Sequence, residues 1–177
     1  ESQVIVPRKG VLELQRLLSD SEEDVVLALG ASHLRLSVGA YQLTTKLVDG
    51  RFPDYERVIP RNGDKQILAN KQDLRRALNR TAILSNEKFR GIRVNFSDGL
   101  VTLTTNNPEQ EDAEETVPIE YTGAALEIGF NVGYLLDVLN VIRGETVKIT
   151  VFDGNSSALI EDPSVDSALY VIMPMKL

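Results

Sequence analysis

The residue types that most often carry catalysis are scarce in this sequence. Its only histidine is His33 and it has no cysteine, so a catalytic triad, a thiolate nucleophile and a histidine-rich metal site all lack support. Acids are concentrated in one segment, at Glu109, Glu111, Asp112, Glu114 and Glu115. Such a cluster can bind a divalent ion weakly, but no phosphate-binding or dinucleotide motif accompanies it. We therefore expect no enzymatic activity, no cofactor and no metal, and we interpret the segment as a solvated loop.

Two other function classes remain as alternatives. A carboxylate-dependent metal enzyme is the main rival hypothesis, and it would require acids that converge from several segments rather than from a single loop. A secreted β-rich adhesion domain is disfavoured because the sequence has no leader and no cysteine.

The composition is typical of a soluble globular protein. With 177 residues, of which 42% are hydrophobic, the chain can bury a core, and it contains neither a membrane-spanning apolar run nor a signal-peptide pattern. We therefore predict a cytoplasmic protein without membrane contact. A net charge of −7 argues against an overall electrostatic hold on nucleic acid, so any DNA contact must come from a local basic surface.

One order of elements is predicted three times along the chain: a short strand, an amphipathic helix and then three strands. The first repeat has a strand at 4–6, a helix at 8–18 and strands at 24–29, 34–38 and 41–48. The second has a strand at 66–68, a helix at 71–84 and strands at 92–96, 101–105 and 116–120. The third has a strand at 126–128, a helix at 132–142 and strands at 147–152, 158–161 and 169–173.

Matching positions in the repeats are separated by a nearly constant step of 62 and then 61 residues, as in the series Ile5, Ile67, Ile128 and Leu12, Leu74, Leu135. A single helix covers the apolar face of such a repeat only partly, so two repeats are expected to close around a shared core. Repeats two and three then form one domain. Repeat one is half of another domain whose other half is missing, and the turn-rich segment 49–57 is the junction.

Three segments carry a specific family resemblance: LVDGRFPDY at 47–55, AILSNEKFRG at 82–91 and YVIMPMKL at 170–177. In order and spacing they resemble the bacterial DNA sliding clamp, the beta subunit of DNA polymerase III, over essentially the whole chain. The resemblance implies the DNA clamp fold, an α+β fold of repeated βαβββ units with helices on one face of antiparallel sheets. Residues 1–54 would be the second half of the middle clamp domain, and residues 55–177 the C-terminal clamp domain.

The function implied by the resemblance is that of a DNA polymerase processivity factor without catalytic activity. Such a clamp encircles double-stranded DNA without reading its sequence. It tethers DNA polymerase subunits, the clamp loader and repair proteins through a pocket that binds short peptides with Gln and Leu or Phe anchors. The family closes its ring head to tail as a homodimer. Because this chain lacks the partner surface, we expect that it cannot close the ring.

By the same resemblance, the peptide pocket lies between the middle and C-terminal domains. Its matching positions are Pro53, Arg57, Val58, Phe89, Asn131, Tyr134, Asn155, Ser157, Met173, Pro174, Met175, Lys176 and Leu177. Lys176 stands where the family commonly has Arg, and Asn155 where an apolar residue is common. The first half of the middle domain normally supplies part of the wall, so this chain would carry most of the pocket but not all of it. Without the resemblance, 173–177 is merely a last strand with an edge proline.

The resemblance also assigns residues that face DNA or the neighbouring subunit. Those predicted to face DNA are Arg8, Lys9, Arg75, Arg76, Arg80 and Arg90. Arg76 and Arg80 are four positions apart and share a stripe opposite the apolar positions of their helix, although a solvated helix face is the plainer interpretation. Those predicted at the subunit interface are Ile83, Leu84, Glu109, Glu111, Asp112, Glu114 and Glu115.

Overall fold

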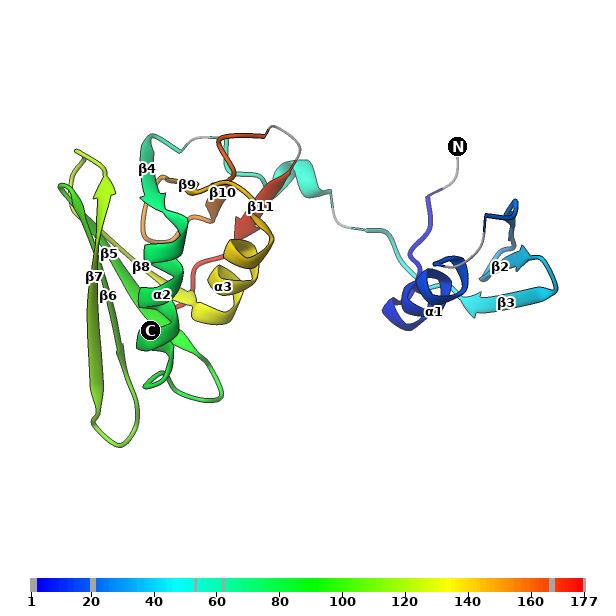
Figure 1. Ribbon diagram of the computed structural model, residues 1–177, viewed down its shortest axis with the longest axis horizontal. Helices are drawn as coiled ribbons and strands as arrows, with labels where there is room; N and C mark the ends of the chain where they lie inside the picture. The colour runs from blue at the N-terminus through cyan, green and yellow to red at the C-terminus, as the bar shows by residue number, and fades with distance from the viewer. Residues whose placement is uncertain (1–2, 20–21, 53, 62, 166–167, 177) are drawn as a thin grey trace. The chain divides into compact units, whose positions relative to one another are not determined.

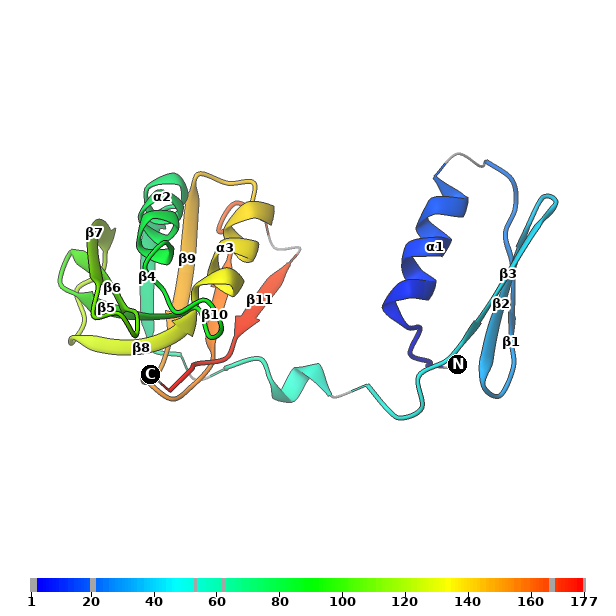
Figure 2. The same ribbon diagram turned by 90° about the horizontal axis from the view of Figure 1, so that it is seen from below.

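The structure is a computed structural model, shown in Figures 1 and 2, that describes residues 3–19, 22–52, 54–61, 63–165 and 168–176. It consists of two compact units, residues 1–54 (unit 1) and residues 55–177 (unit 2). Each unit combines helical segments with antiparallel strands, which confirms the predicted α+β class.

Unit 1 contains one copy of the predicted strand and helix order. Helix α1 (Arg8–Leu18) is followed by β1 (Val26–Leu29), β2 (His33–Val38) and β3 (Tyr41–Lys46), which pair in that order. Beyond β3 the chain returns to the start of the unit, where Val48 forms an antiparallel bridge with Ile5 and its N–H donates to the Ile5 carbonyl at 2.9 Å. The strand predicted at 4–6 is therefore reduced to this single bridge.

Unit 2 contains the other two copies. Its elements are η1 (Tyr55–Arg57), β4 (Lys65–Asn70), α2 (Lys71–Ala82), β5 (Gly91–Ser97), β6 (Leu100–Asn106), β7 (Asp112–Glu120), β8 (Leu126–Asn131), α3 (Val132–Val141), β9 (Thr146–Val151), β10 (Ala158–Glu161) and β11 (Leu169–Ile172). The strands form one antiparallel sheet in the order β11-β10-β9-β4-β7-β6-β5-β8. Helices α2 and α3 lie side by side on one face of this sheet (Figures 1 and 2).

The two repeats of unit 2 are joined by a reciprocal exchange of strand partners. The first strand of one repeat, β4, pairs with the second strand of the other, β9, with Ile67 opposite Ile149. The first strand of the other repeat, β8, pairs in the same way with β5, so that Ile128 lies opposite Val94. Neither repeat could complete the sheet alone, which explains why the two form one core.

Both helices of unit 2 begin with an asparagine cap. The Asn70 side chain accepts hydrogen bonds from the backbone N–H groups of Gln72 and Asp73, and the Asn131 side chain accepts one from Gly133. These bonds satisfy N–H groups that have no partner within the helix. The predicted inner face of α2 is confirmed, because its buried residues are Leu74, Ala77, Leu78 and Thr81.

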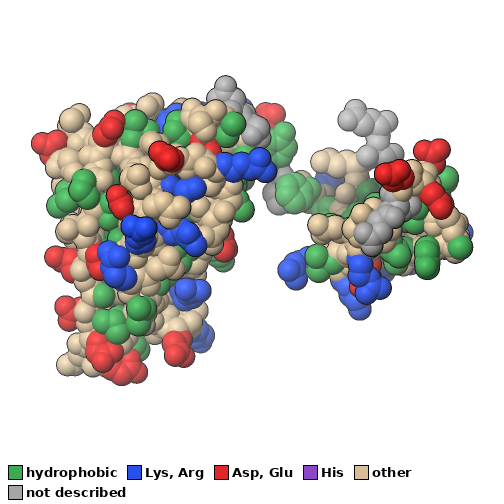
Figure 3. Space-filling model, viewed as in Figure 1, with side chains coloured by type: hydrophobic (Ala, Val, Ile, Leu, Met, Phe, Trp, Pro, Cys, Tyr) green, Lys and Arg blue, Asp and Glu red, His purple; other side chains and the backbone are tan. Residues whose placement is uncertain are grey.

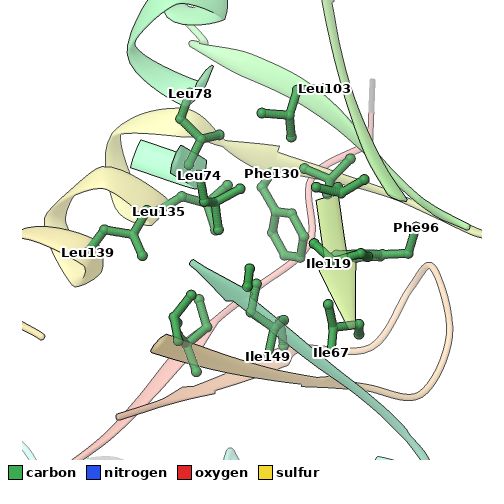
Figure 4. Close-up of a pocket in the computed structure, with 16 residues that line it drawn as sticks. Ile67, Leu74, Leu78, Phe96, Leu103, Ile119, Phe130, Leu135, Leu139 and Ile149 are labelled. Carbon is green, nitrogen blue, oxygen red and sulfur yellow. The ribbon is translucent and has the colours of Figure 1, made fainter. Parts of the chain in front are cut away.

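The core of unit 2 lies between these helices and the sheet. A small apolar cavity of about 20 Å³ remains inside it, lined by side chains from both helices and several strands (Figure 4). Phe130 of β8 projects into the centre of this cluster, with Leu74 of α2 on one side and Ile119 of β7 on the other (Figure 4). Only 1% of Phe130 is exposed, so this ring is a main filler of the core.

The prediction of a loop for the acidic segment 109–115 is wrong for its C-terminal half. Strand β7 begins at Asp112 and not at 116, and Asp112, Glu114 and Glu115 are paired opposite Asn106, Thr104 and Leu103 of β6. The polar residues outnumber the apolar ones in this stretch, so the two-residue alternation of a strand was hidden. The hydrogen bonds of the neighbouring strand decide the conformation here.

Candidate functional site

Two grooves run along the tail of unit 2, defined as residues 173–176. The tail groove has a volume of about 840 Å³ and is lined by Arg93, Glu127, Gly129, Gly154, Asn155, Ser157, Met173, Pro174, Met175 and Lys176. The loop groove has a volume of about 330 Å³ and is lined by Asn86, Phe89, Gly91, Arg93, Thr104, Thr105, Asn106, Met175 and Lys176. Met175 and Lys176, at the end of the tail, line both grooves.

Glycines on the outer face of the sheet make room for the tail. Ile92 of β5 is buried in the core, so its neighbours Gly91 and Arg93 face outward by strand alternation. Arg93 lies opposite Gly129 of β8. Because neither glycine has a side chain, the sheet is left bare there, and the Met175 N–H donates to the Gly129 carbonyl at 2.8 Å.

The walls of the tail groove combine adaptable apolar groups with one ion pair. Met173 is 70% exposed, and methionine side chains adjust to apolar partners of varied shape. Pro174 adds a rigid ring and has no backbone N–H to satisfy. On the sheet side, Arg93 Nη1 lies 3.3 Å from Glu127 Oε1, and both side chains are partly exposed. The groove can thus take apolar side chains and offer polar groups at its edge.

The rim that carries Asn155 and Ser157 is fixed by a carboxylate. The N–H groups of Asn155 and Ser156 donate to Asp153 Oδ1 at 2.9 and 2.7 Å. These bonds, that from Asn155 first, lower the pKa of the Asp153 carboxyl below its ordinary value, because they favour its charged form. The rim is therefore held by an ionised side chain at neutral pH.

Asn131 connects the start of α3 to the loop that carries Phe89. Its Oδ1 accepts from the Gly133 N–H at 2.9 Å, and its Nδ2 donates to the Phe89 carbonyl at 3.1 Å. The Phe89 ring itself is 54% exposed, with Lys88 Nζ 5.3 Å from its centroid. Asn131 therefore positions the loop and is bonded to it within the chain.

Basic side chains gather over the helices of unit 2 (Figure 3). Arg76 and Arg80 are exposed on α2, and Arg75 is half-buried. Arg80 makes a bidentate ion pair with Glu115 of β7, at 2.5 and 2.8 Å. This contact raises the pKa of the Arg80 guanidinium and lowers that of the Glu115 carboxyl. Two residues predicted to serve different surfaces therefore contact each other.

The other predicted surface residues are divided between the helix end and the β6–β7 hairpin. Ile83, directly after α2, is 78% exposed, and Leu84 is half-buried. Glu109 and Glu111 lie in the turn of the hairpin and are exposed, and Asn107 Nδ2 donates to Glu111 Oε2 at 2.8 Å.

Comparison with protein families matches both units. The family description "DNA polymerase III beta subunit, C-terminal domain" matches residues 56–176, and "DNA polymerase III beta subunit, central domain" matches residues 1–54. The chain belongs to the DNA polymerase III beta subunit family. The resemblance drawn from the sequence is confirmed.

Individual beta subunits agree with this assignment. The beta sliding clamp of Pseudomonas aeruginosa is 58% identical over 99% of the chain, and that of Escherichia coli K12 is 52% identical over 98%. A crystal structure of the P. aeruginosa DNA polymerase III subunit beta superimposes with a TM-score of 0.89 at 57% identity, covering 99% of this chain and 48% of that one. Caulobacter crescentus pol III beta gives 0.90 at 40% identity, covering 98% and 47%. The chain spans about half the length of the curated relatives it matches.

The grooves of this beta subunit family member bring together part of the predicted pocket. Asn155, Ser157, Met173, Pro174, Met175 and Lys176 line the tail groove, and Phe89 lines the loop groove. Asn131, Tyr134, Arg57 and Val58 line neither groove, and Tyr134 is 61% exposed on α3. Pro53 and Leu177 lie outside the described residues.

Other parts of these grooves were missed from the sequence. Arg93 and Glu127, together with Gly91 and Gly129, contribute through the outer face of the sheet. The alternation along β5 and β8 could have indicated that they face away from the core, because charged residues and glycines alternate there with core residues. Among the described residues no three histidine or acidic side chains group as a metal site requires, and no described helix is long and apolar enough to span a bilayer.

The remaining basic residues predicted to face DNA lie in both units. Arg8 and Lys9 are exposed in the first turn of α1 in unit 1. Arg90 has a positive φ of 49°, and its guanidinium lies beside Gly133 at the start of α3. A cation therefore lies at the start of α3.

Proposed function

We propose that this chain acts as part of a sliding clamp. The clamp is a non-catalytic processivity factor in the cytoplasm that encircles double-stranded DNA and tethers polymerases, the clamp loader and repair proteins. Residues 1–54 would be the second half of its middle domain and residues 55–177 its C-terminal domain. Membership of the beta subunit family supports each of these assignments.

The tail groove is the single observation that best supports peptide tethering. It combines exposed methionine with a rigid proline and with polar groups from Asn155, Ser157 and Arg93. Extended peptides with Leu or Phe anchors suit such a groove, because apolar side chains gain affinity by burial while polar rim groups orient the backbone. One solved P. aeruginosa clamp is bound to griselimycin, a ligand of that relative.

Contact with DNA is supported by the basic face of the helices. Arg76 is exposed on α2, and Arg90 lies near the start of α3. Such cations bind phosphates without reading bases, which suits a protein that must slide along DNA. Since Arg80 is paired with Glu115, we assign it a smaller share of this contact.

A head-to-tail subunit contact is supported by the exposed helix end. Ile83 offers an apolar anchor, Leu84 lies beside it, and Glu109, Glu111, Asp112 and Glu114 supply negative charge along the hairpin. In the full-length clamp these residues would meet an apolar and basic surface of the next subunit, and the opposite charges would orient the contact.

Peptide binding tests the proposal directly. A fluorescein-labelled peptide with Gln and Leu/Phe anchors is titrated with the chain, and anisotropy reports the complex. We expect saturable binding that Met173→Ala weakens, whereas Val141→Ala, which truncates another exposed apolar side chain on α3, leaves it unchanged. A scrambled peptide serves as the ligand control. The assignment of the groove would be contradicted if the anchor peptide and the scrambled peptide bound with equal affinity. It would also be contradicted if Met173→Ala left the affinity for the anchor peptide unchanged.

A further inference from the structure

One turn of unit 2 supplies the rim of the tail groove. The chain between β9 and β10, residues 152–157 (the rim turn), contributes Gly154, Asn155 and Ser157 to the lining of this groove. In the second repeat the corresponding connection, between β5 and β6, consists only of residues 98–99, and neither of them lines a groove. The rim is therefore a consequence of the longer connection in the third repeat.

A connection of six residues needs more support than a connection of two. A two-residue hairpin connection is fixed by its own turn geometry and by the strands at its ends, whereas longer loops adopt more conformations. Within the rim turn, Asp153 accepts the N–H groups of Asn155 and Ser156. These bonds order the turn internally but do not attach it to the sheet, so the attachment has to come from other elements.

Lys65, the first residue of β4, attaches the rim turn to the sheet. Its Nζ donates to the Phe152 carbonyl at 2.8 Å and lies 5.6 Å from the centroid of the Phe152 ring. It also donates to the Asp64 carboxylate at 2.8 Å, which holds the ammonium group in place. The Lys65 side chain is 24% exposed, so solvent screens these contacts only in part.

The matching position in the third repeat offers an internal comparison. Lys65 lies opposite Val151, at the end of β9. Leu126, which is 61 residues further on and matches Lys65 along the repeats, lies opposite Phe96 near the end of β5. Leu126 is partly buried and packs against the core. A lysine thus stands opposite the strand that enters the longer connection, and a leucine opposite the strand that enters the two-residue one.

The rim turn also lies against β8. A Cβ atom added to Gly154 would be 2.7 Å from the Glu127 carbonyl oxygen, closer than side chains approach a backbone, so the two segments are in direct contact. The turn is therefore held at Phe152 by β4 and limited at Gly154 by β8. Between these two points it presents Asn155 to the tail groove.

Building on the proposed function, in which the tail groove receives the peptide, we infer that Lys65 is a positioning residue for that site. It lines neither groove, but it holds the rim turn in the conformation that meets the peptide. Side chains and loops that must be ordered on binding cost affinity, and a rim that is already ordered avoids this cost. Removing the Lys65 contacts should therefore weaken peptide binding, although no contact with the peptide is removed.

Three variants isolate this role in the anisotropy titration of the anchor peptide. Lys65→Met keeps an apolar stem and removes the donors and the charge, whereas Lys65→Arg restores both. Lys148→Met is the matched control, because the Lys148 side chain is 29% exposed, pairs with Glu161 on the same sheet and lies outside the rim turn. We expect Lys65→Met to weaken binding about three- to tenfold. Lys65→Arg and Lys148→Met should each change the affinity by less than about twofold.

NMR relaxation of the backbone N–H groups in the free chain separates positioning from a general loss of stability. In Lys65→Met the order parameters of residues 154–157 should fall below about 0.6, from the value of about 0.85 typical of rigid backbone, while those of β6 stay unchanged. A rim that stayed rigid in Lys65→Met would overturn the proposal. A mobile rim with unchanged affinity, or an equal loss of affinity in Lys148→Met, would overturn it as well. Absence of binding by the unmodified chain would instead refute the proposed function, and the role of Lys65 would fall with it.

Discussion

Replacing Phe130 by alanine should destabilise unit 2 strongly without removing its fold. The ring is 1% exposed and lies at the centre of the core cluster (Figure 4). Without the ring, the folded state loses about 1.5–3 kcal/mol of hydrophobic transfer free energy. The cavity left behind brings the total loss of stability to about 3–5 kcal/mol. Domains of this size are stable by about 5–15 kcal/mol, so unit 2 should stay folded at 25 °C. At roughly 4 °C per kcal/mol, its Tm should fall by about 12–20 °C in scanning calorimetry.

Phe89→Ala is the matched control, because it removes the same ring from a site that is 54% exposed. Its free energy of unfolding should change by less than about 1 kcal/mol. Affinity for the anchor peptide should fall, because the family resemblance assigns Phe89 to the peptide pocket and Phe89 lies in the loop groove beside Met175 and Lys176. If Phe130→Ala lowered the Tm by no more than Phe89→Ala does, the core packing described for unit 2 would be wrong. An unfolded Phe130→Ala chain at 25 °C would mean that unit 2 is less stable than its size suggests.

Three further perturbations test local features. Hydrogen bonds from the Ser164 hydroxyl and the Gly144 N–H lower the pKa of Asp162 to about 2 from 3.8, so its stabilising effect is complete above pH 4 and is lost as the pH falls toward 2. Asp162→Asn should lower the Tm at pH 7 and flatten the Tm profile between pH 4 and 2; an unchanged profile would exclude this role. Asn70→Ala removes the α2 cap and should cost about 1 kcal/mol in urea unfolding, and no loss would mean that water replaces the cap. In DNA binding measured across a salt series, Arg76→Ala should reduce the slope of log K against log salt by about 0.9, whereas Glu115→Gln, by releasing its Arg80 partner, should steepen it. Equal slopes for both variants would argue against phosphate contacts on α2.

Much of the local structure follows from the sequence because it depends on near neighbours along the chain. The helix predicted at 8–18 is α1, and the strand at 158–161 is β10. The 3.6-residue apolar period of a helix and the two-residue alternation of a strand indicate such bounds without reference to distant residues. The start of β7 at Asp112 was not predicted, because its outward-facing residues are charged and its conformation is decided by pairing with β6.

The residues of the candidate site also differ in whether the sequence could predict them. The tail residues and Phe89 were identified by family motifs, which are local strings. Arg93, Glu127 and the outward glycines were missed, because their place beside the tail depends on the register between β5 and β8. Their alternation with core residues indicates that they face away from the core, but it does not show that the tail lies beside them.

The sequence by itself determined the repeats, their helices and the family. Only the tertiary structure decided which strands exchange between repeats, and that Arg80 of α2 pairs with Glu115, 35 positions away on β7. The physical reason is that a helix or a cap is stabilised by residues within about one turn, whereas a cross-sheet contact exists only once strand order and register have placed its partners together.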